Sequence, residues 1–285
     1  MAPLALVLWA SAPAWADGAA QPGTRPLGTG GALRAAATGD AGPMLNPSGI
    51  SLMRAYVAEG AYQYGSRDSA HDLHVSIVDS TSGFNLGGAL SYTFHTASPP
   101  GASQTGHLGG ASLSFPIGDI VFLGASAKYL YLSTDTNDAT NTTKGFIFDA
   151  GLTVRPLPLF SVGVVGYNLA NRANSLDPQA VGGGVCVNVI PGLSLVLDSV
   201  FERVYGDPTR SQAYYIMGGG EYLVRTVALR LGGGRDGLSE NGYLSGGVSL
   251  ASSAGALDLA LREDIAGDRK GTYVGVSARL FVPSQ

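Results

Sequence analysis

The chain has 285 residues, only 13% of them charged, and a formal net charge of −4 at neutral pH. Soluble domains usually carry about 25% charged residues, so this composition is too apolar for a surface that is wet everywhere. Its acidic balance excludes a nucleic-acid-binding protein, which needs a basic face. After the N-terminus no stretch offers the roughly 18 uncharged apolar residues of a membrane helix. A very apolar secreted β protein or a transmembrane barrel remains.

Residues 1–16 predict a secretory signal peptide. The segment is short and apolar and ends in Ala14-Trp15-Ala16, an A-x-A-like cleavage pattern. It lacks the usual Lys or Arg near its start, and the alternative is a buried N-terminal element. Export implies an oxidising compartment, but Cys186 is the only cysteine, so no intramolecular disulfide can form. Stability must therefore come from closed backbone pairing.

Residues 17–53 form a separate segment before the strands, with one or two helical turns. Residues 17–31 are rich in Gly and Pro and are expected to be irregular, whereas residues 32–37, with the sequence ALRAAA, predict a short helix stopped by Gly39. Asn46 is a good N-cap and Pro47 suits the first helical position. Residues 47–52 should therefore form one helical turn that redirects the chain into the first strand.

Residues 54–285 predict fourteen strands of about 9–13 residues, the length that a tilted strand needs to cross a bilayer. Alternation is clear in residues 84–95, where Phe84 and Leu90 share one face while Asn85 and Thr93 share the other. The expected strand cores are 54–64, 71–79, 84–95, 107–115, 120–132, 145–155, 159–169, 179–190, 193–205, 212–224, 226–234, 242–253, 256–265 and 271–282.

The connections between these strands alternate between longer polar loops and tight turns. Seven polar loops fall on one side and six tight turns on the other, and both chain ends fall on the tight-turn side. Outer-membrane barrels have this arrangement, with an even strand number. A soluble β-sandwich has no reason to sort its connections by length. The sequence therefore predicts an all-β fold, a transmembrane antiparallel barrel of about fourteen strands.

Charged residues of the strands share the parity opposite to the apolar face, so we expect them to line the lumen. On the lipid side, Arg or Lys at mid-depth would cost roughly 2–4 kcal/mol. Paired side chains filling a narrow lumen are favoured over a polar track for a solute, because buried charges are tolerated mainly when paired. Pairs of strand glycines suit either strong curvature or the close approach of an internal plug. The expected lumen charges are Lys128, Asp149, Arg155, Asp198, Glu202, Glu221, Arg225, Arg230, Asp258, Arg262 and Arg279.

Neither an enzyme nor a metal or cofactor site is expected. The sequence lacks GxSxG, HExxH and CxxC patterns. His71 and His74 flank Asp72, but two histidines and one aspartate near a loop do not make a convincing metal site. His74 and Ser76 lie two apart on one face, which is the nearest approach to an acyl-hydrolase pair, and such a spacing is common by chance.

Residues 27–53 resemble the start of the FadL and PorV/PorQ group of outer-membrane proteins. That group typically has G-x-G-G-A, an Ala-rich stretch, an Asp, and then Asn-Pro-Ala-Gly before the first strand. Ser48 here replaces the usual Ala. The matching positions are Gly28, Gly30, Gly31, Ala32, Asp40, Asn46, Pro47 and Gly49.

The resemblance implies that residues 17–53 are a hatch that plugs the barrel from the periplasmic side. It also implies a bacterial outer-membrane location with both termini in the periplasm. Members that carry hydrophobic molecules are thought to release them through a wall gap near a kinked third strand, and Gly87-Gly88 would supply such a kink here. No loop exceeds about a dozen residues, which favours the shorter PorV/PorQ-like members over long-chain fatty-acid carriers.

Three functions remain open. The first is passage of small hydrophobic compounds across the outer membrane through a plugged barrel with lateral exit. The alternative is a non-transporting scaffold or secretion-associated interaction protein, and an open porin is a third. The expected partners are outer-membrane lipid and either a small hydrophobic ligand or an envelope protein.

Overall fold

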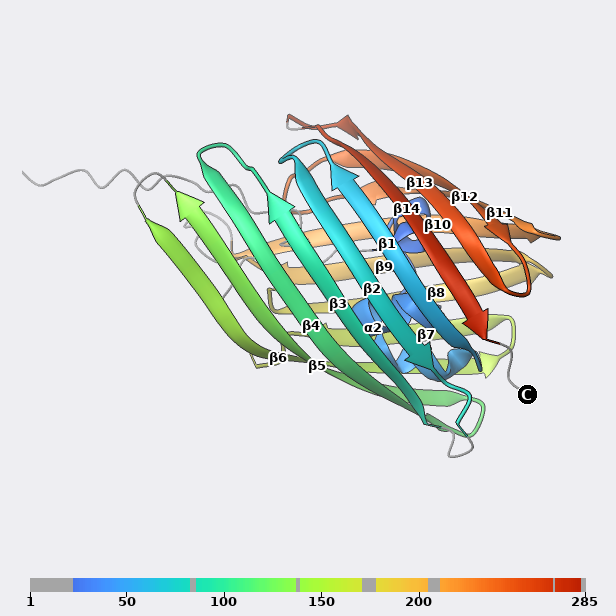
Figure 1. The fold of residues 1–285 in the computed structure, drawn as a ribbon. Coiled ribbons are helices and arrows are strands. Elements are labelled where there is room, and N and C mark those ends of the chain that lie inside the picture. The colour runs from blue at the N-terminus through green and yellow to red at the C-terminus, as the bar shows by residue number, and fades with distance from the viewer. Residues whose placement is uncertain are drawn as a thin grey trace, which may run out of the picture.

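The computed structural model describes residues 23–82, 86–136, 139–170, 178–204, 211–268 and 270–282. Fourteen strands close into one antiparallel barrel, in which each strand pairs with its sequence neighbours and β1 pairs with β14 (Figure 1). The predicted fourteen-stranded barrel with a small helical N-terminal segment is confirmed. The predicted signal peptide, residues 1–16, and the positions Phe84 and Asn85 lie outside the described residues.

The strands form continuous antiparallel ladders, and Tyr56 at the start of β1 pairs with Val282 at the end of β14. Both chain ends of the barrel therefore lie at one end, called the turn end here because it carries the short connections 118–120, 158–159, 191–192, 225–226 and 252–254. The opposite end is the loop end. The strands are β1 Tyr56–Gly65, β2 Ala70–Asp79, β3 Gly87–Ala97, β4 Ala102–Ile117, β5 Val121–Thr136, β6 Thr140–Leu157, β7 Phe160–Tyr167, β8 Ala180–Ile190, β9 Leu193–Arg203, β10 Gln212–Val224, β11 Val227–Arg235, β12 Gly242–Ala251, β13 Gly255–Ala266 and β14 Thr272–Val282.

Strands β4, β5 and β6 are longer than predicted, at 16, 16 and 18 residues. They are the long green strands of Figure 1. Residues expected to form polar loops, 96–105 and 133–144, lie partly inside them. Ladder pairing continues through these polar residues, for example between Thr134 and Asn141.

The outer face of the barrel is apolar and the inner face is polar or packed. On β13, Leu257, Leu259 and Leu261 are 63%, 49% and 48% exposed, while Asp258 and Arg262 on the other face of the strand are buried. An apolar outer band with a closed hydrogen-bond ladder is what a bilayer requires of a spanning β structure. The outer face also carries a Tyr–His pair on β1 and β2, with Tyr62 Oη 2.7 Å from His71 Nδ1.

Among the helices of the described residues, none combines the length and the apolar character needed to cross a membrane.

Residues 23–53, called the plug here, lie inside the barrel, where Figure 1 shows them as blue helical turns. Nearly every side chain from residue 23 to 50 is buried. The plug therefore fills much of the lumen that the strands enclose. Its elements are α1 Thr24–Gly28, η2 Gly39–Ala41, α2 Gly42–Leu45 and η3 Pro47–Leu52.

The helical turn at 47–52 was predicted correctly. Asn46 is its N-cap, the Asn46 side chain accepts a hydrogen bond from Ser48 N at 3.2 Å, and Pro47 holds the first helical position. The predicted helix at 32–37 is wrong, because the backbone there bonds to other partners: Arg34 N donates to Asp198, and Arg34 O accepts from Asn46 Nδ2.

The segment 17–31, expected to be irregular, contains α1. Pro26 lies in the first turn of α1, where the missing N–H costs no helical hydrogen bond. Leu27 packs against Ala260 and Tyr273 of the wall. The helix is therefore stabilised by tertiary packing that its Gly- and Pro-rich neighbourhood does not indicate.

Besides the smaller contacts of Leu27 and of Ile50, two larger apolar clusters join the plug to the wall. In the larger one, Leu33 and Leu45 pack with Val165 of β7 and with Tyr215 and Met217 of β10. The smaller cluster, called the lumen patch here, places Met44 of the plug against four inward-facing aliphatic side chains. These side chains are Leu108 of β4, Leu130 and Leu132 of β5 and Ile147 of β6.

Candidate functional site: the plug and the lumen wall

Inward-facing wall glycines make room for the plug backbone. A Cβ atom at Gly124 of β5 would overlap Ser48 N and Pro47 C, and one at Gly151 of β6 would overlap Asn46 Oδ1. A Cβ at Gly163 of β7 would overlap the Arg34 carbonyl. The wall is therefore shaped to the backbone of the plug rather than only to its side chains.

The glycines of the hatch motif make the same close approaches from the plug side. Gly30 has φ +70°, and a Cβ there would lie 2.7 Å from Gly233 N. Gly31 also has a positive φ of +83°, a conformation that disfavours a side chain. A Cβ at Gly28 would lie 3.3 Å from Arg230 Cδ, and one at Gly49 would overlap the carbonyl of Ala37 within the plug.

A chain of alternating charges runs through the lumen and begins on the plug. Arg25 Nε of α1 is 3.1 Å from Glu221 Oε2 of β10. Arg230 Nε lies 2.6 Å from the same oxygen, and Arg230 Nη1 lies 2.8 Å from Asp258 Oδ1. Each of these charges therefore has an opposite charge beside it, as a low-dielectric lumen requires.

The same charge chain ends on the plug. Arg279 Nη2 of β14 is 2.9 Å from Asp258 Oδ2, and Arg279 Nη1 is 3.6 Å from Asp40 Oδ1. Burial by itself would raise the pKa of the Asp40 carboxyl, but the Arg279 guanidinium, a hydrogen bond with Glu59 and the charge of Arg25 together outweigh burial and hold that pKa below its ordinary value. Asp40 is therefore ionised at neutral pH. We call the set Arg25, Glu221, Arg230, Asp258, Arg279 and Asp40 the charge chain.

A second anchor is Arg34, whose side chain is fully buried. Its Nη1 lies 3.2 Å from Asp198 Oδ2, and its backbone N donates to the same oxygen at 2.8 Å. Its Nε donates to Tyr167 Oη at 2.9 Å, and Tyr167 Oη donates in turn to Leu45 O at 2.5 Å. Arg34 thus ties the middle of the plug to both β7 and β9.

Most of the expected lumen charges lie in the lumen beside partners. Lys128 Nζ is 2.5 Å from Asp149 Oδ2. Arg262 Nη2 is 3.2 Å from both Asp236 and Asp264, and Glu202 is buried on β9. The two plug arginines, Arg25 and Arg34, were not identified from sequence. Their presence in an otherwise uncharged stretch was the available signal.

Two of the expected lumen arginines differ from the rest. Arg155 is half-buried at the turn end, donates to Leu52 O at 3.1 Å and lies over the Phe122 ring at 5.1 Å. Arg225 does not line the lumen. It is exposed in the tight turn between β10 and β11 with φ +54°, so the strand parity used to place it does not extend to it.

His74 and Ser76 both face the lumen rather than the outer wall. His74 is buried, and its Nδ1 is 2.8 Å from Thr93 Oγ1 of β3. His95, also buried, lies 2.7 Å from Asp72. His107 faces outward, 2.6 Å from Tyr92 Oη. The four histidines are therefore divided between two faces of the wall.

Gly87 and Gly88 lie at the start of β3, and only Gly87 faces the plug. A Cβ at Gly87 would lie 2.7 Å from both Ile50 Cγ2 and Ser51 Oγ, whereas one at Gly88 meets nothing nearer than Leu113 Cδ2 at 3.9 Å. Both glycines pair with β4, Gly88 also pairs with Asp79 of β2, and neither ladder has a register shift here. Gly87 thus serves the fit of the plug.

We expect Gly87→Leu to push η3 away from the wall and Gly88→Leu to leave it in place. The two changes add the same side chain to neighbouring residues, one inward and one outward. Planar-bilayer conductance should rise several-fold only for Gly87→Leu. Equal conductance of the two variants would show that Gly87 does not constrain the plug.

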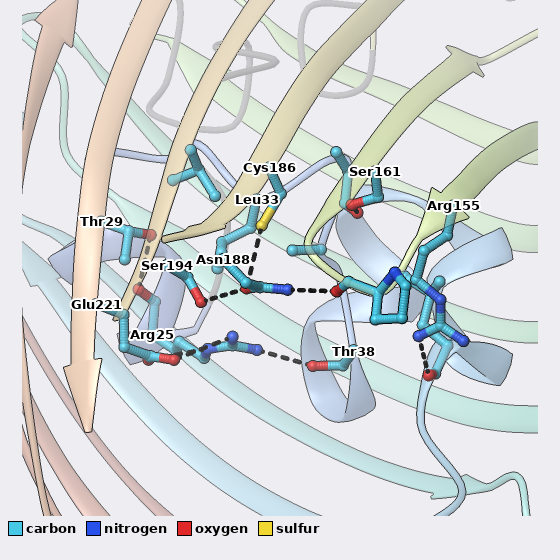
Figure 2. A pocket seen from close by; sticks show the side chains of 15 residues that line it. Arg25, Thr29, Leu33, Thr38, Arg155, Ser161, Cys186, Asn188, Ser194 and Glu221 are labelled. Atoms are coloured by element: carbon cyan, nitrogen blue, oxygen red, sulfur yellow. Dashed lines mark hydrogen bonds and ion pairs between the residues drawn. The ribbon is translucent and has the colours of Figure 1, made fainter. Parts of the chain in front are cut away.

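A cavity of about 160 Å³ lies at the turn end between the plug and the wall. Figure 2 shows Arg25 and Glu221 on one side of it, Arg155 on the other, and Leu33, Cys186 and Asn188 between them. Asn188 Nδ2 donates to Pro158 O at 3.0 Å, and Ser194 Oγ donates to Asn188 Oδ1 at 2.7 Å. We call this space the turn-end cavity.

Comparison with known proteins gives a likeness in structure alone. No family model matches the sequence, and no curated protein matches it. A Pseudomonas aeruginosa FadL homologue superposes with a TM-score of 0.68 at 11% identity, over 91% of this chain and 98% of the homologue. The P. putida toluene transporter TodX gives a TM-score of 0.68 at 9% identity, over 90% of this chain and 97% of TodX.

The FadL half of the resemblance drawn from residues 27–53 is thus supported at the level of the fold. The PorV/PorQ half is not tested and stays a prediction. This chain has the barrel fold of the FadL homologue and of TodX.

Proposed function

We propose that the protein passes small hydrophobic compounds across the bacterial outer membrane through its plugged lumen. The observation that carries the proposal is the lumen patch: four inward-facing aliphatic side chains beside Met44 of the plug. These side chains are buried beneath the plug. When the plug moves, an apolar ring gains about 25 cal/mol for each Å² that it buries against them, whereas an inorganic ion or a sugar gains nothing. The shared fold with a toluene transporter supports the same reading.

We also propose that the turn end faces the periplasm. The first strand begins and the last strand ends there, and η3 makes its close contacts with the wall there. A hatch that plugs the barrel from the periplasmic side would have this position. The route proposed here ends at the turn end rather than in the wall. β3 stays paired with β4 at Gly87 and with both neighbouring strands at Gly88, while the turn-end cavity lies against the plug.

Uptake of radiolabelled toluene by Gram-negative cells tests this function. Cells that make the protein should accumulate toluene several-fold faster than cells that do not. Leu132→Asn, which places an amide in the lumen patch, should remove most of the gain. The control is Gln104→Asn. Gln104 is a buried polar residue that faces the lumen from β4, as Leu108 does, and its change should keep the gain. Equal uptake with and without the protein would reject the proposal.

The alternative is a non-transporting scaffold, and the charge chain is the observation that favours it. Ion pairs at two points of the plug, at Arg25 and at Asp40, hold it against β10 and β14 of the wall. Crosslinking in intact membranes should then recover a stoichiometric envelope protein, and toluene uptake should be absent. Uptake that depends on the lumen patch would decide against the scaffold.

A further inference from the structure

The turn-end cavity has the size of one aromatic ring. An apolar cavity of about 150 Å³ holds a benzene molecule, and the turn-end cavity measures about 160 Å³. A long acyl chain does not fit in such a volume. Part of its lining is apolar, from Leu33, Ala35 and Ala36 of the plug and Val196 of β9.

The rest of the lining is positively charged on balance. Its ionised groups are two guanidinium groups, Arg25 and Arg155, and one carboxylate, Glu221. Glu221 is held by Arg25 and is shared with Arg230. Arg155 has no carboxylate within ion-pair distance among the residues that the structure describes, and only its Nη1 is used, by Leu52 O. A guanidinium group with free donors binds a carboxylate well, because its planar fork matches the two oxygens.

We propose that the turn-end cavity binds a one-ring aromatic carboxylate. The ring lies against Leu33, Ala36 and Val196, and the carboxylate accepts hydrogen bonds from Arg155. As an identification of the substrate class, this rests on the proposed function, for which the cavity is the last binding station before release at the turn end. The neutral hydrocarbon ring alone uses only the apolar half of the lining.

Calorimetric titration of the full chain in nanodiscs of a zwitterionic lipid tests the site, with benzoate and its uncharged isostere benzamide as probes. The wild-type chain should bind benzoate at least tenfold more tightly than benzamide. Arg155→Gln should abolish that preference, and Arg155→Lys, which keeps the charge, should retain most of it. Ala36→Phe fills the cavity and should weaken both probes.

Arg225→Gln is the matched control, since it removes an exposed arginine from the same end of the barrel without touching the cavity. It should keep the full preference for benzoate. Absence of benzoate binding, equal binding of the two probes, or an equal loss in Arg225→Gln and Arg155→Gln overturns the proposal. Circular dichroism and heat-modifiable migration on gels establish that each variant is folded.

Toluene uptake tests the proposed function separately. If the protein prefers benzoate through Arg155 but takes up no toluene, the proposed site is supported and the proposed function is rejected. If the protein takes up toluene but shows no preference for benzoate, the proposed function is supported and the proposed site is rejected.

Discussion

Replacing Gly124 by leucine should open the barrel. A Cβ at this position would overlap Ser48 N and Pro47 C, which are backbone atoms and cannot rotate away as a side chain would. Gly124 is itself fixed by pairing with Ser114 of β4 and Gly151 of β6. The plug must therefore move. We expect steady conductance in planar bilayers at least tenfold above that of the wild-type chain.

Gly109→Leu is the control for this change. Gly109 lies on β4 and faces outward, where the nearest atom to an added Cβ is Tyr92 Cδ2 at 3.9 Å. It should leave the conductance at the wild-type level, and deletion of residues 17–50 sets the value for a barrel without its plug. If Gly124→Leu conducts no more than Gly109→Leu, the plug does not close the lumen at η3.

The number of strands and the closure of the barrel were predictable because residue alternation and connection length are visible for each strand in the sequence. In β10 the predicted range 212–224 coincides with the observed strand, and exposed and buried residues alternate from Gln212 to Met217. The ends of β4, β5 and β6 were missed because ladder pairing outside the apolar band needs no hydrophobic alternation. Residues such as Thr142 and Thr143 pair with β5, but their composition is that of a loop.

The plug was predictable only where its structure is local. The Asn46 cap and Pro47 depend on residues two or three positions apart, so sequence spacing reveals them. The partners of Arg25 and Arg34 lie 196 and 164 residues away, and no local pattern points to them. The ALRAAA segment shows the same limit, because its helix propensity yields to hydrogen bonds with the wall and with Asn46.

The glycine contacts and the buried ion pairs constrain the plug in different ways. The wall glycines fix where the plug backbone can lie, through shape alone. The buried ion pairs fix which charged residues must face each other, because an unpaired charge there is costly. A variant that fills a glycine position should therefore displace the plug sterically, whereas a variant that removes a charge should loosen it by leaving the opposite charge without its partner.

Arg34→Met is expected to loosen the plug more than any other single charge removal in it. The side chains of Arg34 and Asp198 are both 0% exposed, and breaking a buried pair costs about 3–5 kcal/mol. Asp198 keeps the hydrogen bond from the Arg34 backbone, so we expect the lower value, about 3 kcal/mol. At 1.4 kcal/mol for each factor of ten, the open fraction in single-channel recordings should rise roughly a hundredfold.

Two further variants test whether the broken Arg34–Asp198 pair causes the higher open fraction. Adding Asp198→Asn to Arg34→Met removes the stranded carboxylate and should recover much of the closed state. Arg25→Gln leaves Glu221 paired with Arg230 at 2.6 Å, so no charge is stranded, and it should raise the open fraction by about tenfold or less. If the double variant is as open as Arg34→Met, or if Arg25→Gln matches it, the Arg34–Asp198 pair is not the main anchor of the plug.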